Sequence, residues 1–227
     1  MRLFASTLIV LVSGAAAAPA AAEPRQATCL GRSVTYELVI PAGDVPRPAL
    51  VLLHGAGGSR LDLVKSWLAL ADREHLVLIA PQLPLDTAFE AIAPAVLRCI
   101  VGDAMRATLI NARQIYLFGY SMGGYLALDA AMFESDLFLA VGLYAAAIAD
   151  GYEGIVDHAT RRVPIALYIG DRDQFYSVAR VQHTRDLLVR RGFDVRYTEF
   201  AGQDHAYAPV SSRINEDVWR FFVSHQR

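Results

Sequence analysis

The sequence predicts an α/β protein with a mostly parallel central sheet and helices on both faces. Short apolar runs alternate with longer segments of helical periodicity, which is the pattern of repeated strand–helix units. Several of these runs are apolar throughout, as expected of strands buried on both faces: 49–53, 76–80, 138–145 and 165–169. The 227 residues are enough for one domain with a sizeable core.

The first 22 residues predict a secretory signal peptide. A positively charged start is followed by an apolar stretch and then by a run of alanines, and cleavage is expected after Ala20 or Ala22. A retained membrane anchor is disfavoured because the apolar stretch is too short to span a bilayer. Residues 23–227 then form the mature domain, which we expect to be secreted or periplasmic, with no stable membrane anchor.

The remaining elements follow from local patterns in chain order. A short tail at 23–33 precedes an alternating segment at 33–40, which predicts an antiparallel edge strand. A capping pattern after the glycine-rich loop at 54–59 predicts a helix at 60–74. We further expect a loop at 82–88 and then a helix with Pro94 near its beginning and Asn111 near its end. A strand at 115–120 is followed by a helix to 133 and, after the next strand, by a connection at 146–163. The C-terminal part is expected to contain a helix at 176–191, a strand at 193–200, a loop at 201–210 and a last helix from Ser211 or Ser212.

Composition and charge exclude several classes of function. The formal net charge is −2 without a long run of one sign, so nucleic-acid binding has no electrostatic basis. The histidines, cysteines and acidic residues show no spacing typical of a metal site, and no cofactor is expected. The two cysteines, Cys29 and Cys99, both belong to the mature chain. In an oxidising compartment they form either one disulfide or two buried thiols.

The segment Gly119-Tyr120-Ser121-Met122-Gly123 has the features of a nucleophile elbow. An apolar strand precedes it and a helix follows, and the two glycines remove side chains that would collide in so sharp a turn. An ordinary strand-to-helix turn is the alternative for the bare pattern. In the elbow, the Ser121 hydroxyl projects above the sheet and the Met122 N–H faces an incoming oxyanion.

A serine nucleophile needs a base and an acid at suitable places in the chain. Of the six histidines, His205 lies in the loop between the last strand and the last helix, and so satisfies the order serine, acid, histidine. Asp173, about one turn beyond the strand at 165–169, is the expected acid. Asp171 is the nearest competitor, although it could cap the turn. The fainter alternatives are Asp150 and Asp157.

The loop His54-Gly55-Ala56-Gly57-Gly58 supplies a second oxyanion donor in this interpretation. Glycines permit positive φ and close approach, so backbone N–H groups can converge there. Ala56 N–H is the expected donor, with Gly57 next. A phosphate-binding loop is the alternative, but no lysine follows at the required spacing.

Together, these motifs resemble the α/β-hydrolase superfamily over essentially the whole mature chain. The glycine-rich loop and the compact size are similar to the serine esterase branch of feruloyl esterases, poly(3-hydroxyalkanoate) depolymerases and dienelactone hydrolases. The nucleophile of dienelactone hydrolases proper is cysteine, whereas here it is Ser121. The resemblance implies acyl transfer through an acyl-enzyme, and the short connection at 146–163 implies no large lid.

The function expected from the sequence is therefore that of an exported serine hydrolase. Its partner would be a small-molecule or polymeric ester. A prolyl-oligopeptidase-like peptidase and a non-catalytic binding protein on the same scaffold are the alternatives. We expect the cleft to be lined from among five residues: Leu83, Tyr144, Phe175, Tyr176 and Tyr207.

Overall fold

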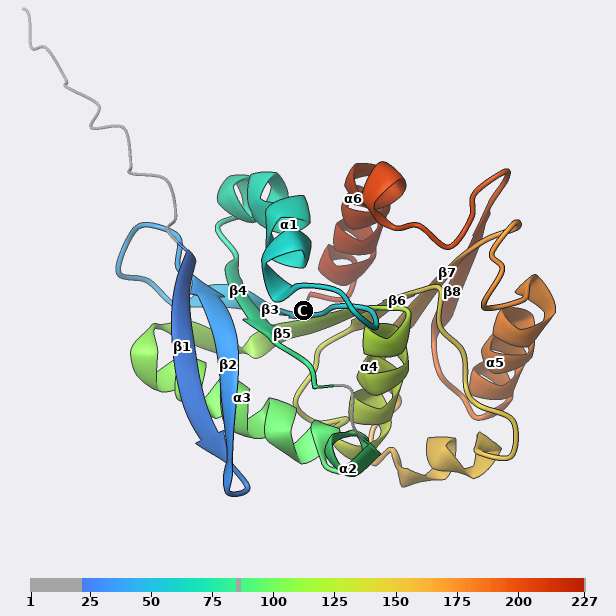
Figure 1. The fold of residues 1–227 in the computed structure, drawn as a ribbon, viewed down its shortest axis with the longest axis horizontal. Helices are drawn as coiled ribbons and strands as arrows, with labels where there is room; N and C mark the ends of the chain where they lie inside the picture. Colours follow the sequence, from blue (N-terminus) through green and yellow to red (C-terminus); the bar gives the residue numbers. More distant parts are fainter. Residues whose placement is uncertain (1–21, 85–86, 227) are drawn as a thin grey trace, which may run out of the picture.

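The computed structural model describes residues 22–84 and 87–226, apart from the side chains of residues 87 and 88, and the predicted signal peptide lies almost entirely outside this part of the chain. One eight-stranded sheet runs through the molecule in the order β1-β2-β4-β3-β5-β6-β7-β8 (Figure 1). The strands are β1 (Ala22–Cys29), β2 (Arg32–Val39), β3 (Arg47–Leu53), β4 (Val77–Pro81), β5 (Ile110–Tyr120), β6 (Val141–Tyr144), β7 (Ile165–Gly170) and β8 (Val195–Phe200).

The sheet is parallel from β4 to β8 and antiparallel where β1 pairs with β2 and β2 with β4. The prediction of a mostly parallel sheet is confirmed. Two details of the N-terminal part were wrong. Residues 23–33 were expected to be a tail but contain most of β1, and β1 rather than β2 is the edge strand.

Helices cover both faces of the sheet. They are α1 (Arg60–Glu74), α2 (Thr87–Glu90), α3 (Ala93–Ala107), α4 (Met122–Phe133), α5 (Val178–Arg190) and α6 (Ser211–Val223), with the short 3₁₀ turns η1 (Glu153–His158) and η2 (Ala208–Val210). Figure 1 shows α1 and α6 side by side above the sheet and α3 and α4 below it. Helix α5 packs against β7 and β8.

The helix boundaries differ from the prediction at three places. The loop expected at 82–88 ends in α2, and η1 interrupts the connection at 146–163. Helix α3 ends at Ala107 rather than near Asn111, because Ile110 already begins β5 and Arg47 N–H donates to the carbonyl oxygen of Leu109. None of these changes inserts a large lid over the carboxyl ends of the strands.

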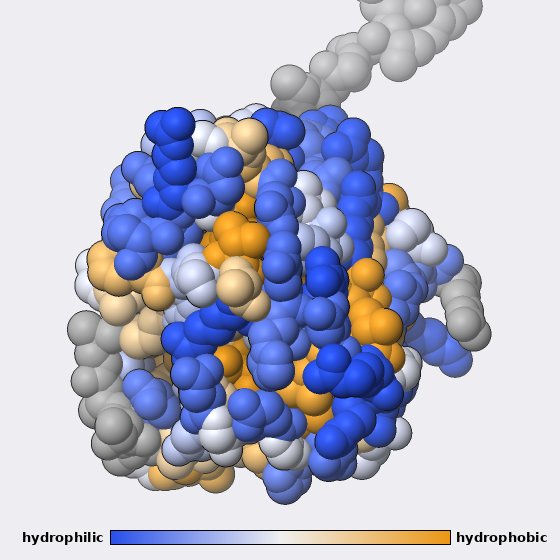
Figure 2. All heavy atoms as spheres, turned by 90° about the vertical axis from the view of Figure 1, so that its right-hand side faces the viewer, coloured by the Kyte–Doolittle hydropathy of each residue, from blue (hydrophilic) through white to orange (hydrophobic). Residues whose placement is uncertain are grey.

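The core is built from the apolar strands and the helix faces against them. Tyr116 of β5 stacks on Phe222 of α6 with ring centroids 4.8 Å apart. Gly142 of β6 lets α6 approach, since a Cβ there would lie 2.9 Å from the Val218 side chain. At the β8 and α5 end of the molecule, polar side chains cover most of the surface and apolar residues are visible in strips between them (Figure 2).

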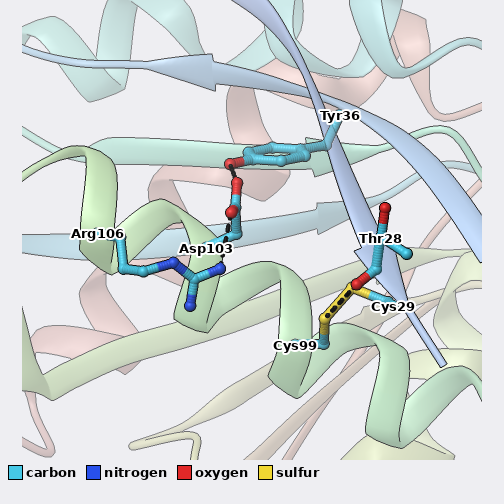
Figure 3. The surroundings of a disulfide bond; sticks show 6 residues. All are labelled: Thr28, Cys29, Tyr36, Cys99, Asp103 and Arg106. Atoms are coloured by element: carbon cyan, nitrogen blue, oxygen red, sulfur yellow. Dashed lines mark hydrogen bonds and ion pairs between the residues drawn. A yellow bond between two sulfur atoms is a disulfide. The ribbon is translucent and has the colours of Figure 1, made fainter. Parts of the chain in front are cut away.

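A disulfide fastens the edge strand to the body of the protein. Cys29 at the end of β1 is bonded to Cys99 of α3, with the Cα atoms 5.8 Å apart (Figure 3). Nearby, the Tyr36 hydroxyl donates a 2.6 Å hydrogen bond to Asp103 of the same helix. Asp103 also pairs with Arg106. The disulfide and the Tyr36–Asp103 hydrogen bond both tie the antiparallel end of the sheet to α3.

Candidate active site

Ser121 lies in the sharp turn between β5 and α4. Its φ of 55° and ψ of −121° are a conformation that costs a residue with a side chain on the order of 1–3 kcal/mol. A Cβ on Gly119 would lie 2.2 Å from the carbonyl oxygen of Gly123, and one on Gly123 would lie 2.1 Å from that of Leu53. The Ser121 N–H donates a 2.9 Å hydrogen bond to the Tyr144 carbonyl oxygen. The packed backbone thus maintains the strained turn and leaves Ser121 partly exposed.

The structure brings together the three side chains expected to form a triad. His205 Nε2 lies 2.9 Å from Ser121 Oγ, and His205 Nδ1 lies 2.7 Å from Asp173 Oδ2. Ser121 and His205 are 84 residues apart in the chain, so the arrangement depends on the sheet rather than on local sequence. With Nδ1–H donating to the carboxylate, Nε2 is the acceptor for the serine hydroxyl, which is the tautomer that a general base requires.

The carboxylate of Asp173 is fully buried and held by the backbone. Its Oδ1 accepts hydrogen bonds from the N–H groups of Phe175 and Tyr176, both at 2.8 Å. Oδ2 remains for the imidazole. Because both oxygens are engaged by donors from different segments, the carboxylate has one orientation, and that orientation fixes the imidazole plane.

The competing acidic residues occupy other places. Asp171 accepts a 2.7 Å hydrogen bond from Gly202 N–H, and so ties the loop after β7 to the loop that carries His205. Asp150 and Asp157 pair with arginine side chains. The two loops also touch at Gly170, where a Cβ would lie 2.1 Å from the carbonyl oxygen of Gln203. This close approach brings Asp173 within reach of the histidine.

Aromatic rings surround the imidazole of His205. The ring centroids of Phe175 and Tyr120 lie 4.7 and 5.3 Å from that of His205, and the Tyr176 ring stacks at 6.1 Å. The Tyr120 hydroxyl donates a 3.2 Å hydrogen bond to the His205 carbonyl oxygen. In the same way, the buried Tyr144 donates to the carbonyl oxygen of Asp204 at 3.1 Å. Two tyrosines at the ends of β5 and β6 therefore anchor the histidine loop from below.

The two expected oxyanion donors flank the serine. Met122 is the first residue of α4, so its N–H has no acceptor within the helix. Ala56 lies in a tight turn closed by a 3.0 Å hydrogen bond from Gly58 N–H to the Gly55 carbonyl oxygen, and Gly57 there has a φ of 66°. A Cβ on Gly55 would come within about 3 Å of the Tyr120 ring, so this loop packs directly against the elbow.

His54 positions the glycine-rich loop. Its Nδ1 lies 2.8 Å from the Gly55 carbonyl oxygen, and its Nε2 accepts hydrogen bonds from Leu83 N–H and the Gln82 side-chain amide, both at 3.0 Å. Burial lowers the pKa of His54, which keeps the imidazole neutral with the proton on Nδ1. No local pattern predicted this role, because the partners Gln82 and Leu83 lie 28 and 29 residues away in the chain.

The triad opens into a cleft of about 540 Å³. The predictions for its lining are correct for Phe175 and Tyr176 only. Tyr144 and Tyr207 are buried beneath the site, and Leu83 lines a different cavity. The cleft also contains three residues that sequence reasoning missed: Tyr120, Tyr125 and Arg180.

Arg180 is the charged group of the cleft. Its guanidinium lies over the Tyr176 ring at 5.7 Å and 3.7 Å from the carboxylate of the exposed Asp150. Within residues 22–84 and 87–226, no group of three or more histidine, cysteine or acidic side chains could hold a metal ion. In those same stretches, every helix is too short or too polar to cross a bilayer.

Many solved structures share this fold, and three of them illustrate the range. A thermostable esterase is 21% identical with a TM-score of 0.71, over 89% of this chain and 62% of that one. Esterase PE8 is 21% identical with a TM-score of 0.71, over 81% and 96%. A provisionally assigned dipeptidyl aminopeptidase IV from Bacteroides ovatus is 11% identical with a TM-score of 0.78, over 90% and 36%.

The chain thus spans less than two thirds of the length of two of these proteins, and at such identities the likeness concerns the fold alone. No curated protein matches the sequence. A sequence model of the alpha/beta hydrolase family, however, matches residues 50–227, which contain the elbow, the glycine-rich loop and the Ser121–His205–Asp173 cluster. The chain therefore belongs to the alpha/beta hydrolase family.

Proposed function

We propose that this protein is an exported serine hydrolase that cleaves carboxylic esters through an acyl-enzyme. The observation that carries the proposal is the continuous chain of hydrogen bonds from Ser121 through His205 to the buried Asp173, at the mouth of an open cleft. A serine hydroxyl is a weak nucleophile at neutral pH and needs such a base. The esterase fold of two structural relatives favours an ester as substrate.

The acylation step uses the geometry directly. Ser121 Oγ attacks the ester carbonyl carbon while His205 Nε2 takes its proton, and Asp173 stabilises the imidazolium that forms. The N–H groups of Met122 and Ala56 donate to the oxyanion of the tetrahedral intermediate. Each such donor contributes on the order of 3 kcal/mol to the barrier reduction. The imidazolium then protonates the leaving alcohol as the C–O bond breaks.

Deacylation repeats the sequence with water. His205 takes a proton from a water molecule as the water attacks the acyl carbon, and the proton passes to Ser121 Oγ when the ester bond to the enzyme breaks. The open cleft supports this step, because water reaches the acyl-enzyme without the movement of a lid. Each proton transfer therefore begins or ends at His205 Nε2, which Asp173 keeps oriented toward Ser121 Oγ.

Export is supported by two features. The first 22 residues have the pattern of a signal peptide, and the Cys29–Cys99 disulfide is typical of an oxidising compartment. Because β1 begins at Ala22, cleavage after Ala20 would leave the strand whole, whereas cleavage after Ala22 would remove its first residue. The mass of the mature protein from a secreting host tests the export and distinguishes the two sites.

Turnover of p-nitrophenyl acetate and butyrate tests the activity. The wild type should hydrolyse both esters, and Ser121→Ala should reduce kcat by a factor of about 10⁴ or more. Ser212→Ala, an exposed serine of α6, is the matched control and should keep the wild-type rate. Equal rates in the wild type and Ser121→Ala would disprove the serine mechanism.

Two further measurements address the alternatives. A panel of peptide amides tested beside the esters separates an esterase from a peptidase, and faster cleavage of the amides would overturn the proposed substrate class. A fluorophosphonate probe should label the folded wild type and not Ser121→Ala. Failure to label the wild type would favour a binding protein on a hydrolase scaffold.

A further inference from the structure

A second cavity lies beside the active-site cleft, along the same side of α4. Ser121, Tyr125, Asp129 and Phe133 follow one another at intervals of four residues, so they form one stripe along the helix. Tyr125 lines both the cleft and the second cavity, which has a volume of about 620 Å³. Its other walls come from Glu90 of α2, Pro94 of α3 and the segment 151–158 that contains η1, which packs against α4.

Asp129 is a buried carboxyl group that the protein leaves without a partner. Its side chain lines the second cavity and the residue is 9% exposed. Among the described residues, none donates a hydrogen bond to it or forms an ion pair with it. Burial, with a smaller contribution from the carboxylate of Glu90, raises the pKa of Asp129 to about 7. An ionised carboxylate that is buried without hydrogen-bond donors is unfavourable unless a ligand supplies a positive charge.

The rest of the lining combines aromatic rings with small and aliphatic residues, and among the described residues it includes no lysine or arginine. The residues around Asp129 and Glu90 are Ala91, Pro94, Tyr125, Phe133, Gly151, Tyr152, Gly154, Ile155 and His158. Tyr152 and Phe133 are 61% and 50% exposed, so a ligand in the cavity can reach both rings. The His158 ring lies against Phe133 with centroids 4.6 Å apart. Aromatic faces next to carboxylates are the surroundings in which organic cations bind.

From these observations we propose that the second cavity is a subsite for an organic ammonium group carried by the ester substrate. Asp129 and Glu90 supply the opposite charge, and the rings of Tyr125, Phe133 and Tyr152 contact the methyl or methylene groups of the cation. This assignment rests on the proposed esterase function for its substrate, while the binding of the cation itself does not depend on ester cleavage.

The helix geometry sets the length of such a substrate. Eight residues separate Ser121 from Asp129 along α4, which corresponds to about 12 Å at the rise of an α-helix. The ammonium group would therefore stand at the far end of a chain of several methylenes from the carbonyl carbon, with Tyr125 contacting the chain between them. A preference for cationic esters should appear only above a minimum chain length.

The test compares p-nitrophenyl esters of alkanoic acids that end in a trimethylammonium group with esters that end in its uncharged isostere, a tert-butyl group. For the wild type we expect kcat/KM for the ammonium ester to exceed that for the isostere by at least about tenfold at the optimal chain length, and by much less for short chains. Asp129→Asn should bring the ratio close to one. Asp44→Asn, which changes an exposed turn residue, should keep the wild-type ratio.

Phe133→Ala removes one ring from the exposed rim of the cavity and should lower the ratio part of the way. This variant keeps the proposal testable if Asp129→Asn folds poorly. A ratio near one in the wild type, or an undiminished ratio in both Asp129→Asn and Phe133→Ala, would overturn the proposal. Because the ratio is taken within each variant, a general loss of activity does not imitate the expected result.

Binding measurements separate this proposal from the esterase function. Calorimetric titration of the wild type should detect choline but not 3,3-dimethyl-1-butanol, its uncharged isostere, and Asp129→Asn should lose the choline signal. If no ester is cleaved but choline binds in this way, the esterase proposal fails and the cation site stands. If esters are cleaved and choline does not bind, the cation site fails alone. Choline should compete with the ammonium ester; binding without competition would overturn the assignment to the substrate.

Discussion

The buried Asp129 makes a contribution to the stability of the folded protein that is lost as pH rises. Folding raises the pKa of this carboxyl from its usual value of 3.8 to about 7, chiefly through burial and secondly through Glu90. The folded state therefore holds the proton over a range in which the unfolded chain has released it. Stability is lost as pH rises from about 4 to about 7, which is opposite to the contribution of a carboxylate in an ion pair.

The size of this effect follows from the two pKa values. One pKa unit corresponds to about 1.4 kcal/mol, so burial of Asp129 costs roughly 4 kcal/mol above pH 7. About 2.5 kcal/mol of this cost develops between pH 5 and pH 8. Asp129→Asn removes the titration and nearly preserves the shape of the side chain. Relative to the wild type, the variant should gain about that amount of unfolding free energy over this pH interval.

Urea unfolding of both proteins at pH 5 and pH 8, with the disulfide intact, provides the measurement. The difference between the two proteins cancels the titration of groups they share, including the buried His54. Asp44→Asn serves as the control and should shift stability by less than about 0.5 kcal/mol at either pH. A difference between Asp129→Asn and the wild type that stays constant or shrinks from pH 5 to pH 8 would refute the argument.

Three other predictions test the framework of the site. Replacing Cys29 and Cys99 together by serine removes a cross-link between residues 70 positions apart and should lower the unfolding free energy by about 4 kcal/mol, measured by urea unfolding. A loss below about 1 kcal/mol would contradict this prediction. Asp173→Asn should keep the fold by circular dichroism but reduce kcat by about 10⁴, because the imidazole loses the acceptor that sets its tautomer; near-normal turnover would argue against the triad. Gly123→Ala should abolish activity or folding, since the new Cβ would meet a carbonyl oxygen of β3 at 2.1 Å. As the control, Gly102→Ala in α3, where the nearest neighbour would lie at 4.0 Å, should stabilise the protein by about 1 kcal/mol. Similar shifts of the melting temperature for both variants would refute the steric argument.

The parallel part of the sheet was predictable because its strands are apolar on both faces. The elbow was predictable because its sharp turn has no room for side chains at the two glycine positions. The sequence also identified Ser121, Asp173 and His205, which the structure brings within hydrogen-bond distance, although their catalytic role stays a prediction. These residues follow the ends of parallel strands, and such ends meet at one edge of a sheet. Their positions relative to the predicted strands were therefore sufficient to predict that they meet.

The N-terminal strand could not be predicted in this way. Five of the eight residues of β1 are exposed and only Ala27 and Cys29 are buried, so no continuous apolar face marks the segment as a strand. Its position depends on the pairing with β2 and on the disulfide, and neither is visible in a local pattern. Likewise, Asp129 lies in a run of alanine and leucine that indicates only a buried helix, and the cavity beside it arises from the distant elements α2 and η1.

The bond between Cys29 and Cys99 also determines how this protein has to be produced. With two cysteines in the whole sequence, only one intramolecular pairing exists, so oxidation alone completes it and no reshuffling of wrong isomers is required. A reducing host would instead leave β1 attached by its backbone pairing with β2, and a loosened strand at a sheet edge is a template for pairing between molecules. Yields of monomeric protein should accordingly depend on the redox state of the compartment in which the chain folds.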